Sequence, residues 1–381
     1  MQDRLHEQLV GGELMAPNWS KAKVTAFRRA LLGWYDQEKR DLPWRRDHDP
    51  YHILLSETML QQTQVATVIP YYEHFLQLFP TVQALAQAPE DQVMKAWEGL
   101  GYYSRARHLQ QAAKQVVQDY GGQFPRTAAE LRQLSGIGPY TAGAIASIAF
   151  NQPEPAIDGN AFRVFSRLFK IDADIAKPQT RQLFDQLIRQ LIDPKRPGDF
   201  NQAIMDLGSS YMRAKDPDPA HSPLAAFDQS YLSDTVMDYP VKSKKKPKKV
   251  VPYFALVIHS PQGYLLVRRP RTGMLADLWM FPLVDRSELD AALEVDQLVE
   301  AADRFEALAD VHLTFEVTGA KLVRHTFTHQ QWQLTLVQAD SPAFDLAVLP
   351  AKWVKAADFG RLALPTVQKK LLKALGLGGT K

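Results

Sequence analysis

The sequence predicts a multidomain chain in which an all-α domain is followed by an α+β domain. From residue 20 to about residue 230, apolar residues recur at spacings of three and four, as in VTAFRRALLGWYDQE (24–38), which is typical of helices with one buried face. A stretch with six lysines, VKSKKKPKKV (241–250), then interrupts this pattern. Strand-like runs such as YFALVIHS and GYLLVRRP follow it.

Composition limits the class of protein. A chain of 381 residues with 45% hydrophobic residues suits about two domains with real cores. No run of eighteen uncharged apolar residues is present, so we expect no membrane span, and the acidic N-terminal segment MQDRLHEQLVGGEL does not resemble a secretory signal. The absence of cysteine excludes disulfides, thiolate catalysis and cysteine-ligated metal sites. With a net charge of only +3, binding of nucleic acid has to depend on local clusters.

The segment LSGIGPYTAGAIASIAF (134–150) predicts two helices joined by a tight turn. Gly136 and Gly138 can take positive φ without steric cost, and Pro139 suits the first turn of a helix. We therefore expect helices at 127–133 and 139–149. Unpaired amides at the start of the second helix can bind a phosphate, although an ordinary corner between two helices has the same glycine spacing.

Two carboxylates lie in mostly uncharged surroundings. Glu57 is in SETMLQQTQV (56–65) and Asp158 is in IDGNAFRVFSRL (157–168). Apolar neighbours such as Leu54 and Met59 would desolvate Glu57, which raises the pKa of a carboxyl and suits it to general-acid catalysis. Taken singly, a solvated helix glutamate and a helix N-cap aspartate are the ordinary alternatives.

The second half of the chain reads as α+β. The turn signal PQG separates the first two strand-like runs, and an acidic, helix-like run covers 287–308. AKLVRHTFTH and WQLTLVQA predict a hairpin, and PTVQKKLLKAL predicts a closing helix. The lysine-rich stretch before these elements cannot form an apolar face, so we interpret it as a linker.

Six segments together resemble the helix-hairpin-helix DNA glycosylase superfamily and, within it, the MutY family of adenine glycosylases. They are LPWR (42–45), SETMLQQTQV (56–65), WEGLGYYSRAR (97–107), LSGIGPYTAGAIASIAF (134–150), IDGNAFRVFSRL (157–168) and FNQAIMDLGS (200–209). They cover most of residues 40–210 in the order of the family.

The resemblance divides the chain into three parts. A helical glycosylase region would cover 1–230, with the helix-hairpin-helix at 127–149 and a cluster-type loop at 208–228. A lysine-rich linker would cover 231–250, and a Nudix-like domain that recognises 8-oxoguanine would cover 251–381. After Phe281 the chain lacks the glutamate-rich helix of Nudix hydrolases, so we interpret this domain as a binding module.

The activity that the resemblance implies is hydrolysis of the N-glycosidic bond of adenine mispaired with 8-oxoguanine or guanine in duplex DNA, after the adenine is flipped out. Glu57 would be the general acid. Asp158 would stabilise the oxocarbenium charge or trap it covalently, and Asn160 would orient these groups. Tyr140 occupies the position where strand-cutting relatives carry lysine, which implies a monofunctional glycosylase.

The resemblance also implies DNA contacts. The residues that match DNA-binding positions are Gly136, Gly138, Trp44, Arg45, Gln62, Thr63, Leu100 and Tyr102. Those that match the 8-oxoguanine-reading loop are Phe327, Thr328 and His329, where the family more often has serine in place of Thr328.

The usual iron–sulfur cluster of the family is not expected here. MutY proteins follow DLG with four cysteines, and the matching places hold Met212, Pro219, Ser222 and Asp228. We therefore expect no cofactor and no metal centre, with packing in place of the cluster, and the one ion that the resemblance implies is a monovalent cation at the hairpin.

Double-stranded DNA with adenine opposite 8-oxoguanine is the expected partner of a monomeric, cytoplasmic, DNA-associated bacterial protein that does not bind membranes. Two alternatives stay open. One is a helix-hairpin-helix glycosylase for another base, against which Tyr140 and the C-terminal module argue. The other is a non-catalytic damage-binding protein, against which the presence of both Glu57 and Asp158 argues.

Overall fold

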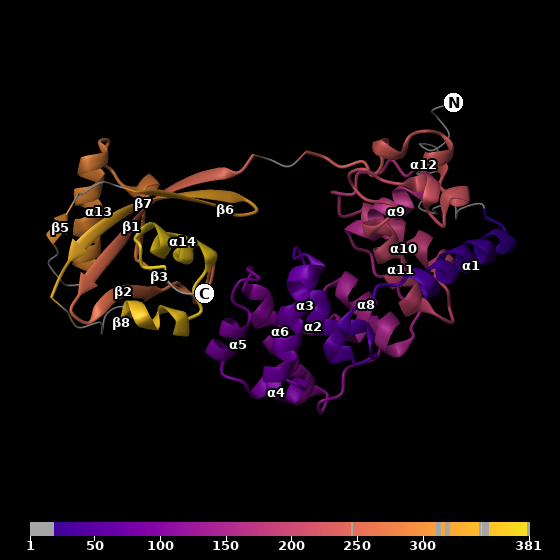
Figure 1. Cartoon of the computed structure of the whole chain (residues 1–381), viewed down its shortest axis with the longest axis horizontal. Coiled ribbons are helices and arrows are strands. Elements are labelled where there is room, and N and C mark those ends of the chain that lie inside the picture. The colour runs from indigo at the N-terminus through magenta and orange to yellow at the C-terminus, as the bar shows by residue number, and fades with distance from the viewer. Residues whose placement is uncertain are drawn as a thin grey trace. The chain divides into compact units, whose positions relative to one another are not determined.

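The computed structural model describes residues 19–244, 247–309, 314–316, 321–342, 344 and 350–378. These residues form two compact units (Figure 1). The first contains the described residues up to Lys244, except Ala88–Arg107. The second contains Ala88–Arg107 and the described residues from 247 on.

Helices dominate the described residues up to Lys244. The α-helices are α1 (Lys21–Glu38), α2 (Pro50–Leu60), α3 (Val65–Leu78), α4 (Val82–Gln87), α5 (Glu90–Ala96), α6 (Ser104–Asp119), α7 (Ala128–Leu131), α8 (Pro139–Phe150), α9 (Gly159–Phe169), α10 (Thr180–Leu191), α11 (Pro197–Ser209) and α12 (Gln229–Leu232). The 3₁₀ helices are η2 (Pro43–Arg45), η3 (Pro219–His221), η4 (Ala225–Phe227) and η5 (Val236–Asp238).

Capping side chains explain where several helices begin. Ser20 accepts a hydrogen bond from the Lys23 amide at the start of α1, and Asp49 accepts one from the Tyr51 amide at the start of α2. Thr127 and Glu130 form a reciprocal capping box at α7. Such caps satisfy amides that have no partner within the helix, and each stabilises its helix by about 1 kcal/mol.

The largest core of the first unit lies between α1, α9, α10 and α11. Phe27, Leu31 and Tyr35 project into it from one face of α1, as the helical spacing predicted. The fully buried side chains of the other three helices include Val164, Phe165, Leu168, Phe184, Leu191, Phe200, Ala203 and Leu207. Since α11 also packs against α8, and α8 packs against α2, this core fixes the helices that carry the candidate active site.

The predicted helical hairpin is confirmed, with one correction. Gly136 has a φ of +73°, and a Cβ at this residue would lie 2.5 Å from the Cβ of His108. Both the backbone conformation and the lack of space for a side chain therefore require glycine here. The expectation of positive φ at Gly138 is wrong: its φ is −85° and it is the extended N-cap residue of α8. No atom lies within 4 Å of the place where its Cβ would be, so this glycine leaves open space in front of the helix N-terminus.

The loop after α11 is held by packing. Met212 and Leu224 are fully buried in the core of the first unit. The Phe227 ring lies 5.6 Å from that of Trp19 and 5.7 Å from that of Phe27. Asp228 is buried and accepts hydrogen bonds from two amides at the start of α12. Apolar side chains and a helix cap thus occupy the segment in which the family usually carries its cluster.

The second unit is built on a mixed eight-stranded sheet. Its strands are β1 (Lys249–Ser260), β2 (Gly263–Arg268), β3 (Trp279–Met280), β4 (Leu283–Asp285), β5 (Thr314–Glu316), β6 (Leu322–Thr326), β7 (Gln330–Asp340) and β8 (Ala351–Val354). The path β3-β2-β1-β7-β5 forms the centre, with β4 beside β1, β6 beside β7 and β8 beside β2. β1 and β7 are parallel, and the other pairs are antiparallel. The predicted hairpin is therefore confirmed as β6–β7.

Helices cover both faces of this sheet (Figure 1). Ala255 and Val257 of β1 face the side of α14 (Thr366–Ala374), and Phe254 and Leu256 face the side of α13 (Glu294–Ala309). This alternation follows from the two-residue period of a strand, and burial on both sides explains why β1 is apolar along most of its length. Two 3₁₀ helices complete the unit: η6 (Arg286–Glu288) and η7 (Ala356–Arg361).

The stretch that joins the two units is shorter than the predicted linker at 231–250. The first unit extends through Lys244, and β1 begins at Lys249. The Val241 carbonyl accepts a hydrogen bond from the Ile175 amide, which ties this segment to the first unit.

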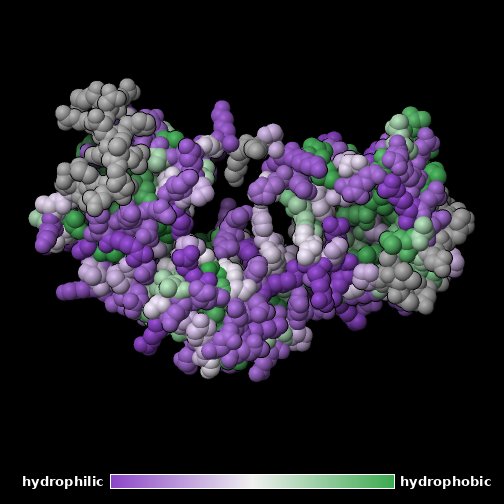
Figure 2. All heavy atoms as spheres, turned by 180° about the vertical axis from the view of Figure 1, so that it is seen from behind, coloured by the Kyte–Doolittle hydropathy of each residue, from purple (hydrophilic) through white to green (hydrophobic). Residues whose placement is uncertain are grey.

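One face of the molecule is seen as spheres in Figure 2. On the face shown in Figure 2, hydrophilic residues predominate and hydrophobic ones form separate patches. None of the helices in the described ranges combines the length and apolar character needed to cross a bilayer.

Candidate active site

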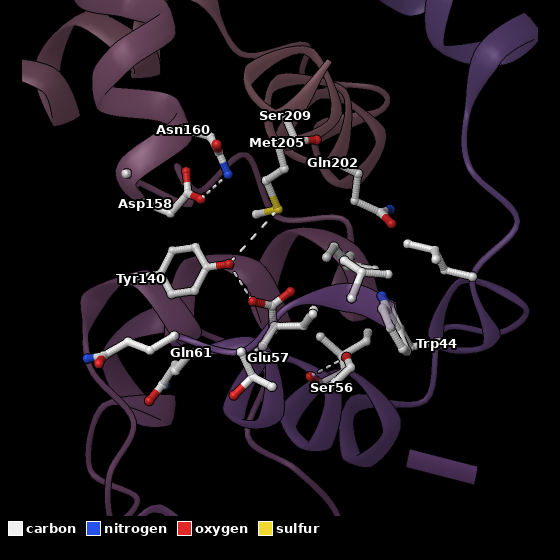
Figure 3. Close-up of a pocket in the computed structure, with 18 of the residues that line it drawn as sticks. Trp44, Ser56, Glu57, Gln61, Tyr140, Asp158, Asn160, Gln202, Met205 and Ser209 are labelled. Atoms are coloured by element: carbon white, nitrogen blue, oxygen red, sulfur yellow. Dashed lines mark hydrogen bonds between the residues drawn. The ribbon is translucent and has the colours of Figure 1, made fainter. Parts of the chain in front are cut away.

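A cavity of about 680 Å³ in the first unit brings together the predicted catalytic residues. Its walls come from η2, the end of α2 with the turn that follows, and the starts of α8 and α9. Side chains of α11 form a further part of the wall. In Figure 3, Glu57, Tyr140, Asp158 and Asn160 point toward one space from three separate segments of the chain.

Glu57 is the buried carboxyl of this cavity. It lies on α2, where most residues from Tyr51 to Met59 are buried, and it is only 6% exposed. This burial raises the pKa of Glu57 from 4.5 to about 7, with a further increase from the charge of Asp158. The hydrogen bond from Tyr140 and the charge of Arg45 act in the opposite direction. A carboxyl with a pKa near neutrality can hold a proton and also release it.

Tyr140 lies between the two carboxyl groups. Its hydroxyl donates a hydrogen bond to Oε2 of Glu57 and lies 3.9 Å from Sδ of Met205. Burial and the neighbouring Glu57 and Asp158 raise the pKa of Tyr140 well above 10, so this phenol is a neutral donor. Tyr140 thus lines the cavity and has a polar partner there, unlike a tyrosine that only fills an apolar core.

Asp158 caps a helix and also lines the cavity, so its N-cap position does not exclude a place in the candidate site. It is the N-cap of α9, where Oδ1 accepts a hydrogen bond of 2.7 Å from the Ala161 amide. Oδ2 accepts one of 2.7 Å from Nδ2 of Asn160, and the carboxyl group lines the cavity (Figure 3). Burial raises the pKa of Asp158, but these hydrogen bonds and the charge of Arg163 oppose the increase.

A second layer of contacts fixes Asn160. Its Oδ1 accepts a hydrogen bond of 2.6 Å from Nη2 of Arg163, and the same Nη2 donates to the Gly208 carbonyl at 2.6 Å. A Cβ at Gly208 would lie 2.6 Å from the Cβ of Asn160, so only glycine allows α11 to approach this closely. The orientation of the Asn160 amide toward Asp158 is therefore set by α9 and α11 together.

Asn201 holds the segment that leads to Asp158. This buried side chain accepts from the Ala156 amide at 3.1 Å and donates to the Glu154 carbonyl at 2.8 Å and to Oγ of Ser147 at 2.9 Å. The Ala156 amide and the Glu154 carbonyl, in the extended segment before α9, thereby have hydrogen-bond partners, as buried backbone groups require.

Trp44 and Arg45, which were expected to contact DNA, lie in the cavity wall. Trp44 is 7% exposed, and its ring meets that of Tyr72 edge to face at 5.4 Å. Both Nη atoms of Arg45 donate to the buried carboxylate of Asp206, at 2.7 and 3.0 Å. The guanidinium of Arg45 is thus paired within the protein.

Gln62 and Thr63 lie in the turn between α2 and α3 and also line this cavity. Gln62 has a φ of +62°, a left-handed conformation that is uncommon for a residue with a side chain. Such strain is often retained where a turn presents side chains to a ligand.

Apart from Gly136 and Gly138 of the hairpin, which belong to the first unit, the other predicted contact residues lie in the second unit, around a cavity of about 550 Å³. Leu100 and Tyr102 line it together with the turn of the β6–β7 hairpin, Phe327, Thr328 and His329. The Tyr102 hydroxyl forms a hydrogen bond with Oγ1 of Thr328. The structure therefore groups the expected wedge residues with the expected 8-oxoguanine-reading loop within this unit.

Arg105 stabilises the loop that carries Tyr102 (residues 100–103) by hydrogen bonds to its backbone. It is 9% exposed, and its Nη2 donates to the carbonyls of Leu100 at 3.0 Å and Gly101 at 3.2 Å. Its guanidinium lies 5.3 Å from the ring centroid of Trp97 and 5.7 Å from that of Tyr102. Tyr102 has a φ of +48°, which is strained for a residue with a side chain, and these contacts help to hold it. The burial of Arg105 favours this supporting role over a contact with solvent or ligand.

Sequence reasoning assigned no role to several residues of the cavity. Gln202, Met205 and Ser209 line it from α11, and Asp206 pairs with Arg45 beside it. The segment FNQAIMDLGS was noted, and the spacing of these positions by three and four predicts a common helix face. That signal could have placed α11 beside the site, but it could not identify the partner of Asp206.

A cysteine-ligated cluster does not fit this chain. Met212 is buried among apolar side chains, and the Asp228 carboxylate already caps α12. Within the described part of the chain, no group of three or more His, Asp or Glu side chains is arranged to hold a metal ion.

Comparisons with known proteins agree with this geometry. Residues 55–190 match the family model described as HhH-GPD superfamily base excision DNA repair protein, and residues 253–374 match the NUDIX domain model. The fold prediction of a helix-hairpin-helix glycosylase domain followed by a Nudix-like domain is thereby confirmed.

Individual relatives extend the similarity over most of the chain. The adenine DNA glycosylase of Homo sapiens is 39% identical over 92% of this chain and 74% of its own length. That of Buchnera aphidicola subsp. Baizongia pistaciae is 36% identical over 67% of this chain and 73% of its own length. The solved structure of a thermostable thymine-DNA glycosylase matches with a TM-score of 0.52 and 26% identity, covering 56% of this chain and 98% of that one.

Proposed function

Because the chain belongs to the adenine DNA glycosylase family, we propose that it hydrolyses the N-glycosidic bond of adenine mispaired with 8-oxoguanine or guanine in duplex DNA. One observation carries the proposal for this chain's own residues. A buried glutamate with a pKa of about 7 and an aspartate that caps a helix line the same cavity. Two carboxyl groups in different environments can divide the acid role and the charge-stabilising role.

Glu57 acts first in this scheme. A base inside the duplex is out of reach, so the adenine has to be flipped into the cavity, at a cost of a few kcal/mol. Protonated Glu57 gives its proton to N7 of the adenine. The bond between the deoxyribose C1′ and N9 then breaks, and its electron pair leaves with the neutral base. General-acid assistance of this kind contributes roughly 10²–10⁴ in rate.

Asp158 stabilises the positive charge that develops on the sugar. Its carboxylate is oriented by Asn160 and by the start of α9, so it needs no rearrangement during the reaction. Water then adds to C1′ while the Glu57 carboxylate accepts a proton from it. Tyr140 offers a phenol with a raised pKa in place of an amine, which supports simple hydrolysis without Schiff-base strand cleavage.

The second unit would read the base opposite the adenine. Phe327, Thr328 and His329 line one cavity with Tyr102, which is 47% exposed. A threonine hydroxyl can donate to O8 of 8-oxoguanine or accept from its N7–H, and an exposed tyrosine can stack at a kinked base step. Gly138 would leave room for a DNA phosphate at the N-terminus of α8, next to the turn that the positive φ of Gly136 allows, and we expect the monovalent cation there.

The proposed setting is repair of bacterial chromosomal DNA in the cytoplasm. The protein would act as a monomer on double-stranded DNA, without an iron–sulfur cluster or another cofactor. The supporting observation is that Met212, Pro219, Ser222 and Asp228 replace the cysteines that hold the family's cluster.

Single-turnover release of adenine tests the proposal. The substrates are duplexes that carry adenine opposite 8-oxoguanine, guanine or thymine, with excess enzyme. We expect release from the first two and little from the third, and we expect Asp158→Asn to slow release by at least about 100-fold. Tight lesion-specific binding without release would favour the damage-binding alternative, and release of another base would favour a different glycosylase.

A further inference from the structure

A cluster of three charged side chains lies beside Glu57 and has no role in the proposed chemistry. Asp206 on α11 is 3% exposed and accepts hydrogen bonds from Nη1 and Nη2 of Arg45 at 2.7 and 3.0 Å. It also accepts one from Nε of Arg40 at 2.9 Å. Burial raises the pKa of Asp206, but the hydrogen bonds and charges of Arg45 and Arg40 lower it more, so this carboxyl is ionised.

Arg45 is placed between this carboxylate and the catalytic cavity. Its side chain is 11% exposed, lines the cavity, and lies 5.6 Å from the ring centroid of Tyr35. The titratable and charged groups that act on Glu57 are Tyr140 from α8, Asp158 at the start of α9 and Arg45 from η2. Arg45 is the cation among them.

This arrangement raises a chemical conflict. A glutamate that donates a proton has to stay protonated near neutral pH, but a buried cation nearby favours the carboxylate form. The conflict is resolved if another group compensates the charge of the cation. Asp206 does not line the cavity, and its bidentate pair with Arg45 compensates this charge and also fixes the guanidinium plane.

We propose that Asp206 is a positioning residue of the reaction: it holds and neutralises Arg45, so that Glu57 keeps the proton that it gives to the base. Arg40, whose side chain is 41% exposed, serves as a second cation that keeps the buried Asp206 ionised. The inference rests on the proposed function, because it assigns a role within that reaction.

The pH profile of single-turnover adenine release tests this role. At saturating enzyme the descending limb of the profile reports deprotonation of Glu57 in the complex. In Asp206→Asn the guanidinium of Arg45 is uncompensated, so we expect the limb to move to lower pH by about 1 to 2 units. In Arg45→Gln the cation is removed while Arg40 still holds Asp206, so we expect the limb to move to higher pH by about 1 unit.

A matched control is available on the same helix. Asp199 of α11 is paired with Arg196 at 2.7 Å and does not line the cavity, so Asp199→Asn is expected to leave the limb in place. Opposite movements in the two test variants establish the proposed role. A purely structural role would lower the rate equally at every pH.

Three results are decisive. An unmoved limb in Arg45→Gln overturns the inference, even if Asp206→Asn does not fold. A limb that moves the same way in both variants overturns it as well. The absence of adenine release by the parental protein would instead overturn the proposed function, so the two failures are distinguishable.

Discussion

Raising the pH through neutrality should deprotonate Glu57, so that it can no longer donate a proton. Burial places the pKa of Glu57 at about 7 in place of 4.5. About nine-tenths of the Glu57 carboxyls are then protonated at pH 6 and about one-tenth at pH 8. Since only the protonated form can donate, single-turnover adenine release should fall about tenfold between these values.

The same displacement of the pKa has a consequence for stability. Glu57 binds its proton more tightly in the folded state than in the unfolded state, so between pH 4.5 and about 7 the folded state carries more protons. The free energy of unfolding therefore falls as the pH rises through this window, by about 3 kcal/mol in total. Glu57→Gln removes this loss, and the variant should be inactive but more stable than the parental protein at pH 8.

Two measurements on the same samples test this reasoning. Adenine release is followed under single-turnover conditions from pH 5.5 to 8.5, and denaturant unfolding is followed at pH 5 and pH 8. Glu73→Gln, a change at an exposed residue of α3, is the control and should alter neither profile. A release rate that is flat from pH 6 to 8, or a Glu57→Gln variant that is less stable than the parental protein at pH 8, would refute the account.

Two further predictions concern the groups that support the sites. Gly208→Ala places a Cβ 2.6 Å from the Cβ of Asn160, so we expect adenine release to slow by about tenfold or more while DNA binding persists. Gly33→Ala in α1 is the control, because no atom lies within 4 Å of the place where its Cβ would be. This control should stabilise the fold by about 0.5–1 kcal/mol. Equal activity of the two variants would contradict the positioning of Asn160. Arg105→Ala removes two hydrogen bonds from the Tyr102 loop, so we expect binding of adenine:8-oxoguanine duplexes in a mobility-shift titration to weaken by about tenfold, and unchanged binding would show that the loop supports itself.

The local geometry of the hairpin was predictable because glycine and proline constrain the backbone directly. Pro139 marked the start of α8, and Gly136 has the positive φ that its place in the turn predicted. The error at Gly138 arose because a glycine can be required for open space as well as for positive φ. Sequence alone does not distinguish these two reasons.

The burial of Glu57 was also predictable, because apolar residues surround it along α2 and the helix has no polar face. The pairing of Arg45 with Asp206 was not predictable. The two residues are 161 positions apart, and neither belongs to a charge pattern within its own helix. Only the packing of α11 against the other helices brings them together. This packing therefore determines that the charge of Arg45 beside the cavity is paired with that of Asp206.

The loop that replaces the cluster was predicted in part. The lack of cysteine excluded the cluster, and packing was expected in its place, as the contact between Phe227 and Phe27 illustrates. The burial of Met212 and Leu224 in the core, and the cap that Asp228 provides, depend on tertiary contacts that no local pattern reports.

We propose that Glu57 and Asp158 release adenine in a chain that has no cysteine. Single-turnover adenine release from an adenine:8-oxoguanine duplex tests this directly, with the iron content of the same protein sample determined by mass spectrometry. We expect full release at an iron content far below one atom per chain, and its loss in Asp158→Asn. No release, or release that rises in proportion to bound iron, would contradict it.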